Sequence, residues 1–196
     1  MKTKLKDKEL VKKFIEGDSY ALEKLIYRHK DKVYTYIYFI VKNEKIAEDI
    51  FQDTFIKVIN SLKKGRYNEQ GVFVSWVIRI AHNLTIDYFR KETRMPTYSN
   101  DANNDTDLFN SKDLAEDTIE DIMIQDQIAK DVRRIVDELP DEQKEVVLLR
   151  HFGNLSFKEI AEQTNVSINT ALGRMRYALI NLRKIVEEKD MKLSKT

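Results

Sequence analysis

A chain of 196 residues and 23.2 kDa is long enough for one domain or two small ones. Charged residues make up 34% and hydrophobic residues 42%, which is typical of a chain that stays in water and buries a core. The absence of cysteine excludes disulfides, thiolate metal sites and cysteine nucleophiles. No apolar run is long enough to span a membrane, and the lysine-rich start precedes no signal-type segment. We therefore expect a cytoplasmic protein without membrane insertion.

The net charge of +1 hides a strong pattern along the chain. Residues 1–95 carry a net charge of +7, residues 96–127 carry −8, and residues 128–196 carry +2. Basic segments on either side of an acidic one point to nucleic acid as the partner of the basic parts. Residues 96–117 are acidic and poor in core residues, so they are predicted to form a flexible linker. The linker would join domains over residues 1–95 and 118–190.

Only five glycines and two prolines interrupt the chain, so the predicted fold class is all-α. A short amphipathic helix should end at Gly17, and Asp18 or Ser19 should cap a second helix. The run VYTYIYFIV over residues 33–41 alternates as a strand would, but its surroundings favour a helix. Residues 44–62 and 72–94 give the clearest helical patterns, with a loop between them.

The C-terminal part has the pattern of a helix-turn-helix domain. A helix over 118–138 should break at Leu139-Pro140, and a helix over 141–152 should stop at Gly153. Ser156 and Glu159 form a capping box for a short helix, and Asn165 suits a left-handed turn position. Ser167 should cap a long final helix that ends near Lys189. A short helix, a tight turn and a longer basic helix are typical of the motif.

Helix 44–62 is predicted to have two contrasting faces. The inward side chains would be Ala47, Ile50, Phe51, Thr54, Phe55, Val58 and Leu62. The outward face would carry Asp49, Gln52, Asp53, Ile56 and Asn60. An exposed isoleucine bordered by carboxylates and an amide is a candidate protein-docking surface, with plain solvated surface as the alternative.

Helix 72–94 combines apolar and basic stripes. Its predicted core stripe is Phe73, Trp76, Val77, Ile80, Leu84 and Tyr88, and its opposite stripe is Arg79, Asn83, Ile86 and Arg90. The preceding loop supplies Lys63, Lys64, Arg66 and Tyr67. Guanidinium groups beside an amide and an apolar contact suit unpaired DNA, although a solvated basic face would show the same composition. Trp76 is interpreted as a core residue rather than a base-stacking platform.

The final helix has no acid and four bases between Gln163 and Lys184. Its predicted inner face is Ala171, Met175, Ala178, Leu182 and Val186. The other face would carry Thr170, Gly173, Tyr177, Asn181 and Lys184, flanked by Arg174 and Arg176. Gly173 weakens a helix by about 1 kcal/mol relative to alanine, and a close approach of the backbone to DNA would explain its presence. The alternative is a solvated face of an ordinary helical bundle.

Three stretches, in this order, resemble a bacterial RNA polymerase sigma factor of the extracytoplasmic-function (ECF) type. AEDIFQDTFIKVINSL at 47–62 is similar to sigma region 2.2, which docks on the coiled coil of the polymerase β′ subunit. Residues 66–94 resemble regions 2.3 and 2.4, which melt and read the −10 element. Residues 139–184 resemble region 4, which reads the −35 element through its helix-turn-helix. The resemblance implies a region 2-like helical bundle and a region 4-like helix-turn-helix domain.

The resemblance also implies a role for individual residues. Asp49, Gln52 and Asp53, with Ile56 beside them, match the residues that meet β′. The loop over 63–72 matches the one that captures a flipped base, and Asn83 matches the asparagine of the IA-x-N stretch. The expected −10 contacts are Lys63, Lys64, Arg66, Tyr67, Arg79, Asn83, Asp87 and Arg90. The expected −35 contacts are Ser167, Asn169, Thr170, Gly173, Arg174, Arg176, Tyr177, Asn181 and Lys184. Leu172 and Gly173 depart from the family pattern, which leaves the −35 sequence open.

The implied function is that of a promoter-specificity subunit, with no catalytic residue, cofactor or metal. The implied partners are core RNA polymerase, through its β′ coiled coil and β flap, and promoter DNA, both duplex and single-stranded; an anti-sigma factor is a further candidate. Two alternatives stay open. A helix-turn-helix regulator acting without polymerase would leave the Asp49 face unused. A nuclease using Asp49, Asp53 and Asp87 with a metal would lack histidine ligands behind those carboxylates.

Overall fold

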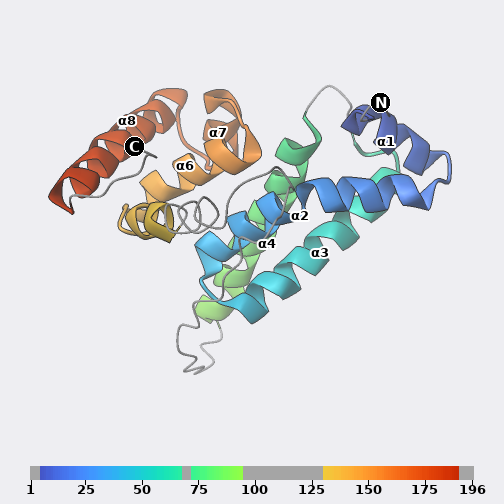
Figure 1. The fold of residues 1–196 in the computed structure, drawn as a ribbon, viewed down its shortest axis with the longest axis horizontal. Helices are drawn as coiled ribbons and strands as arrows, with labels where there is room; N and C mark the ends of the chain where they lie inside the picture. The colour runs from blue at the N-terminus through green and yellow to red at the C-terminus, as the bar shows by residue number, and fades with distance from the viewer. Residues whose placement is uncertain (1–4, 68–71, 95–129, 190–196) are drawn as a thin grey trace, which may run out of the picture. The chain divides into compact units, whose positions relative to one another are not determined.

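The computed structural model describes residues 5–67, 72–94 and 130–189, and every regular element in these ranges is a helix (Figure 1). The predicted linker over 96–117 lies outside them. The helices are α1 (Asp7–Ile15), α2 (Ser19–Val41), α3 (Glu44–Lys63), α4 (Phe73–Arg94), α6 (Asp141–Gly153), α7 (Phe157–Gln163) and α8 (Ile168–Glu188). Residues 130–137 are helical as well. The chain divides into two compact units. The first contains α1 to α4, and the second contains α7, α8 and most of α6.

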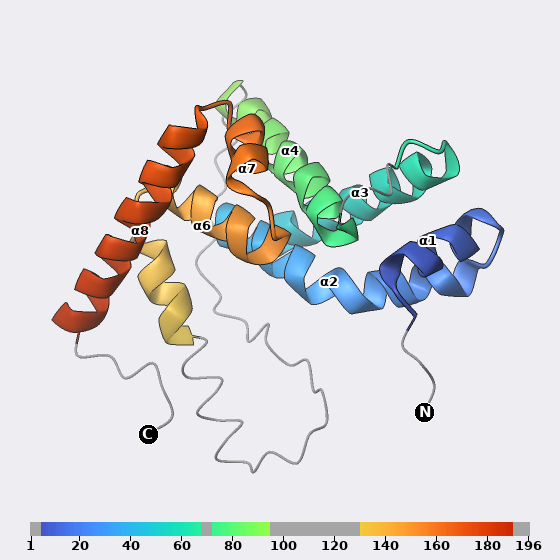
Figure 2. The ribbon, with the colours of Figure 1, turned by 90° about the horizontal axis from the view of Figure 1, so that it is seen from above.

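In the first unit, α2, α3 and α4 pack on one another, and α1 lies along the N-terminal half of α2 (Figure 2). Asp18 caps α2 by accepting hydrogen bonds from the backbone N–H groups of Tyr20 and Ala21, and Asn43 caps α3 through the N–H of Ile46. The ambiguous run over 33–41 is the last part of α2, so its helical assignment is confirmed. The fully buried core includes Leu10, Leu25, Tyr36, Ile37, Leu62, Phe73 and Ile78.

In the second unit, α7 and α8 pack together as a helix-turn-helix. Ser156 and Glu159 form the expected capping box, Asn165 has a left-handed φ of 55°, and Ser167 caps α8 by accepting a hydrogen bond from the N–H of Thr170. One boundary differs, because α6 includes Gly153 and the left-handed residue is Asn154, with φ 51°. Asparagine tolerates this conformation better than other residues with a side chain, so it ends the helix here.

Candidate functional site

The outward face of α3 is the first candidate surface. Asp49, Gln52 and Asp53 are exposed, and Ile56 is 55% exposed between them and the end of the helix. The opposite face is buried through Ala47, Ile50, Thr54, Phe55, Val58 and Leu62, as predicted, and Phe51 is half-buried. An exposed isoleucine bordered by two carboxylates gives this face both an apolar contact and a negative charge.

The end of α3 and the start of the following loop carry the second set. Lys63, Lys64 and Arg66 are exposed, and Gly65 has a left-handed φ of 64° that turns the chain away from the helix. Tyr67 is half-buried because its ring packs on α4, with centroids 4.7 Å from Trp76 and 5.9 Å from Phe73. Trp76 is also only half-buried. The aromatic contacts of Tyr67 therefore fix this part of the loop to α4, next to the exposed basic side chains.

The exposed face of α4 brings the remaining −10 candidates together. Asn83, Asp87 and Arg90 are exposed at successive turns, with Asp87 and Arg90 paired at 3.8 Å, whereas Arg79 is half-buried. The predicted core stripe was partly wrong, because Trp76, Ile80, Leu84 and Tyr88 are only half-buried. The core face instead consists of Phe73, Val74, Ser75, Val77, Ile78, Ala81, His82 and Thr85. The helix is rotated by about a quarter turn from the predicted orientation.

Burial of His82 explains part of this rotation. Its Nδ1 is 2.8 Å from the Tyr36 hydroxyl on α2, and the Thr85 hydroxyl donates a 2.8 Å hydrogen bond to the Ala81 carbonyl oxygen. Both polar side chains are thus hydrogen-bonded while they face the core. Burial lowers the pKa of His82 from 6.5 to about 4, so the ring is neutral at physiological pH. This neutral histidine is the sequence neighbour of the exposed Asn83.

The third candidate surface is the outward face of α8. Ser167, Asn169, Thr170, Arg176 and Lys184 are exposed, and the Tyr177 ring is 61% exposed. Gly173 is half-buried with an ordinary helical backbone, and a Cβ placed there would meet nothing within 4 Å. Nothing within the described fold therefore requires glycine at this position. Ala171 and Ala178 are buried on the opposite side, as predicted, with Met175, Leu182 and Val186 half-buried around them.

Two side chains expected on the outer face of α8 contact α6 instead. The Arg174 guanidinium lies 3.1 Å from the Glu142 carboxylate, and only 19% of its side chain is exposed. Asn181 Nδ2 donates a 2.8 Å hydrogen bond to Gln143 Oε1. The helical angle alone could not predict these contacts, because both polar partners lie in another helix.

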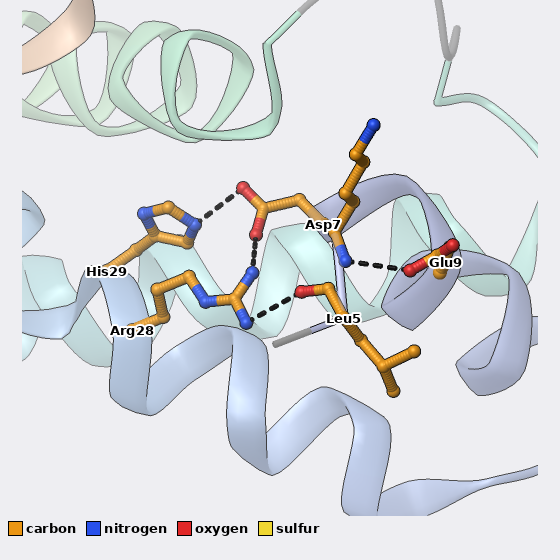
Figure 3. Close-up of polar contacts among 6 residues, drawn as sticks. Leu5, Asp7, Glu9, Arg28 and His29 are labelled. Atoms are coloured by element: carbon orange, nitrogen blue, oxygen red, sulfur yellow. Dashed lines mark hydrogen bonds and ion pairs between the residues drawn. The ribbon is translucent and has the colours of Figure 1, made fainter. Parts of the chain in front are cut away.

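An ionic cluster that joins α1 to α2 was also missed. Figure 3 shows the Asp7 carboxylate between Arg28 and His29 of α2. Asp7 Oδ2 is 2.8 Å from His29 Nε2, the other carboxylate oxygen pairs with Arg28, and Arg28 Nη2 donates a 2.9 Å hydrogen bond to the Leu5 carbonyl oxygen. Burial raises the pKa of Asp7, but His29 and Arg28 lower it by more, so the net pKa lies below 3.8. Its place in the first turn of α1 was the only signal in the sequence.

The described ranges were also compared with the requirements of a membrane span and of a metal site. No helix in these ranges is both long and apolar enough to cross a membrane. They also hold no group of three or more His, Asp or Glu side chains that could bind a metal ion. Asp49, Asp53 and Asp87 are therefore not gathered into such a group.

Comparison with known families gives two matches. The family description "Sigma-70 region 2" matches residues 25–95, and "Sigma-70, region 4" matches residues 129–177. The chain is 30% identical over 181 residues to the "ECF RNA polymerase sigma factor SigW" of Bacillus subtilis, covering 90% of this chain and 95% of the relative. It is 27% identical over 177 residues to the "RNA polymerase sigma-H factor" of Pseudomonas aeruginosa, covering 89% of this chain and 91% of that protein.

Solved structures show the same fold. A sigma factor RpoE from Bartonella quintana, in complex with the anti-sigma factor NepR, aligns with a TM-score of 0.61 and 16% identity over 85% of this chain and 96% of its own. CnrH, in complex with the cytosolic domain of CnrY, aligns with a TM-score of 0.59 and 20% identity over 93% of this chain and 97% of its own. At these identities the likeness extends to the helical architecture alone.

Proposed function

The chain belongs to the extracytoplasmic-function RNA polymerase sigma factors, and we propose that three exposed helix faces divide its work in transcription initiation. The outward face of α3 docks on core polymerase, the α3–α4 loop with the exposed face of α4 holds the −10 strand, and the outward face of α8 reads the −35 duplex. One observation supports this division most strongly. Each set contains exposed side chains, and the three sets lie on separate parts of the chain: the middle of α3, the end of α3 with the following loop and α4, and α8 with its N-cap.

Docking through α3 follows from its chemistry. Ile56 supplies an apolar contact that would lose water on binding, while Asp49, Gln52 and Asp53 form a polar rim around it. A partner for this face needs an apolar groove with basic or amide groups at its edge. We assign this role to the β′ coiled coil of core polymerase.

The −10 surface suits a single strand because it joins a loop to a rigid helix. Lys63, Lys64 and Arg66 provide exposed positive charge, and Tyr67 anchors the loop on Trp76. Asn83 offers both a donor and an acceptor to a base edge. Strand opening needs no catalytic residue, since capture of a flipped base repays an unstacking cost of a few kcal/mol.

The −35 surface suits a duplex because α8 is the second helix of a helix-turn-helix. Ser167, Asn169 and Thr170 lie at its N-terminus, where hydroxyl, amide and backbone N–H groups can hold phosphates. Arg176, Tyr177 and Lys184 follow along the exposed face. Residues 1–95 would thus carry polymerase docking and −10 recognition, and residues 118–190 would carry −35 recognition.

Charge reversal on α3 tests the proposal. Asp49→Lys combined with Asp53→Lys should abolish association with core polymerase in a pull-down, while circular dichroism stays helical, because both residues are exposed. Glu23→Lys with Asp31→Lys is the matched control, since it makes the same change in charge at exposed positions of α2. Retained polymerase binding by the α3 variant would show that the outward face of α3 is not the docking surface.

A further inference from the structure

The recognition helix α8 is joined to the first turn of α6 by two polar contacts. Arg174 Nη2 lies 3.1 Å from Glu142 Oε2, and seven residues further along α8 the Asn181 side chain donates to Gln143. Only 19% of the Arg174 side chain is exposed, whereas 71% of Lys184 on the same helix is exposed. Arg174 therefore lies against the protein, while Lys184 reaches into solvent.

A second carboxylate shares the environment of Arg174. Glu145 is half-buried one turn after Glu142 on α6. Burial raises the pKa of the Glu145 carboxyl, the positive charge of Arg174 opposes that rise, and the negative charge of Glu142 adds to it. Arg174 and Glu142 thus both act on the charge of Glu145. An arginine that is already paired with the Glu142 carboxylate has less to offer a phosphate than an exposed one.

We propose that Glu142 is a positioning residue for −35 recognition, acting through Arg174 to fix the angle of α8 on α6, and that Arg174 does not contact DNA. This inference rests on the proposed role of α8. A helix-turn-helix reads base edges only when its second helix enters the major groove at the right angle, so an element that sets this angle affects specific binding. The charged contacts to DNA then come from exposed side chains such as Arg176 and Lys184.

The salt dependence of DNA binding distinguishes two roles of Arg174. It can brace α8, which means that it only holds α8 on α6, or it can contact a DNA phosphate. Holoenzyme from the full chain and core polymerase would be titrated with a labelled duplex carrying the −35 region of a promoter that it transcribes, and with a scrambled duplex. Glu142→Gln and Arg174→Met should each weaken promoter-duplex binding about two- to fivefold, as loss of a partly exposed ion pair implies. The salt slope and scrambled-duplex binding should not change, and the double variant should bind no more weakly than either single variant.

A different result would overturn the inference. If Arg174→Met lowers the salt slope by about 0.9, Arg174 holds a phosphate. If Glu142→Gln also strengthens binding, Glu142 competes with DNA for Arg174. The charge-swapped pair, Glu142→Arg with Arg174→Glu, should recover promoter-duplex binding if the two residues only brace α8. The swapped chain should bind worse than either single variant if position 174 touches DNA. Because the swapped chain retains an ion pair, it can still be tested if circular dichroism shows that a single variant is unfolded.

Variants of two exposed residues on α8 show whether a failed test affects only this inference or the proposed DNA-binding role of α8 as well. Arg176→Met and Lys184→Met should each lower the salt slope, because both side chains lie on the proposed DNA face. If neither variant does so, α8 is not the DNA-binding element and the proposed function of this face fails. If both do so and Arg174→Met does as well, the DNA-binding role stands and only the bracing role of Glu142 and Arg174 is wrong.

Discussion

His82 links the stability of the first unit to pH. Its pKa is lowered from 6.5 to about 4 by burial, so between these values the unfolded chain binds a proton that the folded protein does not. The contribution of His82 should lower the free energy of unfolding as pH falls from 6.5 to about 4, by up to about 3 kcal/mol, and this contribution should level off below that. Urea titrations followed by the fluorescence of Trp76, the only tryptophan, report on this unit.

His82→Gln should flatten this dependence, because the amide cannot titrate but can still hydrogen-bond to the Tyr36 hydroxyl. His151→Gln is the control, since His151 is exposed and lies in the other unit. An unchanged slope between pH 6.5 and 4 in the His82 variant would show that His82 titrates alike in both states.

Asp7 also makes the stability of the first unit depend on pH, in the same direction as His82 but at lower pH. Its pKa lies below 3.8 in the folded protein, so its contribution to stability is present above about pH 4 and is lost as pH falls through the folded value. Asp7→Asn should lower the free energy of unfolding at pH 7 by about 1–3 kcal/mol, typical of hydrogen bonds to a charged group. The difference should shrink in acid. Asp31→Asn, at an exposed site on α2, should have little effect; an equal loss there would show that the Asp7 cluster is not responsible.

At the scale of the element, Gly173 separates the stability of α8 from its function. A Cβ at this position would meet no atom within 4 Å, and the backbone is helical. Gly173→Ala should therefore stabilise the helix by about 1 kcal/mol, measured by thermal unfolding. The same change should weaken binding of the −35 duplex, because the proposed groove contact leaves no room for a methyl group. Unchanged or tighter DNA binding would mean that Gly173 does not approach DNA.

Helix boundaries could be predicted from the sequence because local chemistry sets them. Asp18, Asn43, Ser156 and Ser167 each cap a helix in the structure with a side-chain hydrogen bond to the backbone. The buried face of α3 was also predictable, since its apolar residues recur at helical spacing. In these cases every signal lies within a few residues of the feature that it specifies.

The buried face of α4 was harder, because side-chain size misled the prediction. Trp76, Ile80, Leu84 and Tyr88 are large and apolar yet half-buried, whereas Ala81, His82 and Thr85 face the core. The histidine is tolerated there through its hydrogen bond to Tyr36, a residue of another helix. The Asp7 cluster and the Arg174–Glu142 pair were missed for the same reason. Such contacts depend on tertiary placement, which helical periodicity does not encode.

At the scale of the whole molecule, two basic surfaces in separate units should fail in different ways. Asn83 lies on α4 of the first unit and Arg176 on α8 of the second, and both are exposed. A change at Arg176 should weaken binding of the −35 duplex, a step that precedes separation of the −10 strands. A change at Asn83 should act only after the strands separate. A premelted −10 template should rescue a melting defect but not a loss of base recognition.

The most direct measurement of this division compares Asn83→Ala with Arg176→Ala in reconstituted holoenzyme, scoring −35 duplex affinity and permanganate reactivity of unpaired −10 thymines on one promoter. Asn83→Ala should leave −35 duplex affinity unchanged and reduce thymine reactivity. Arg176→Ala should weaken −35 duplex affinity and lower the salt slope of binding. If Asn83→Ala weakened the −35 duplex complex and left promoter opening intact, the proposed division between the two surfaces would be contradicted.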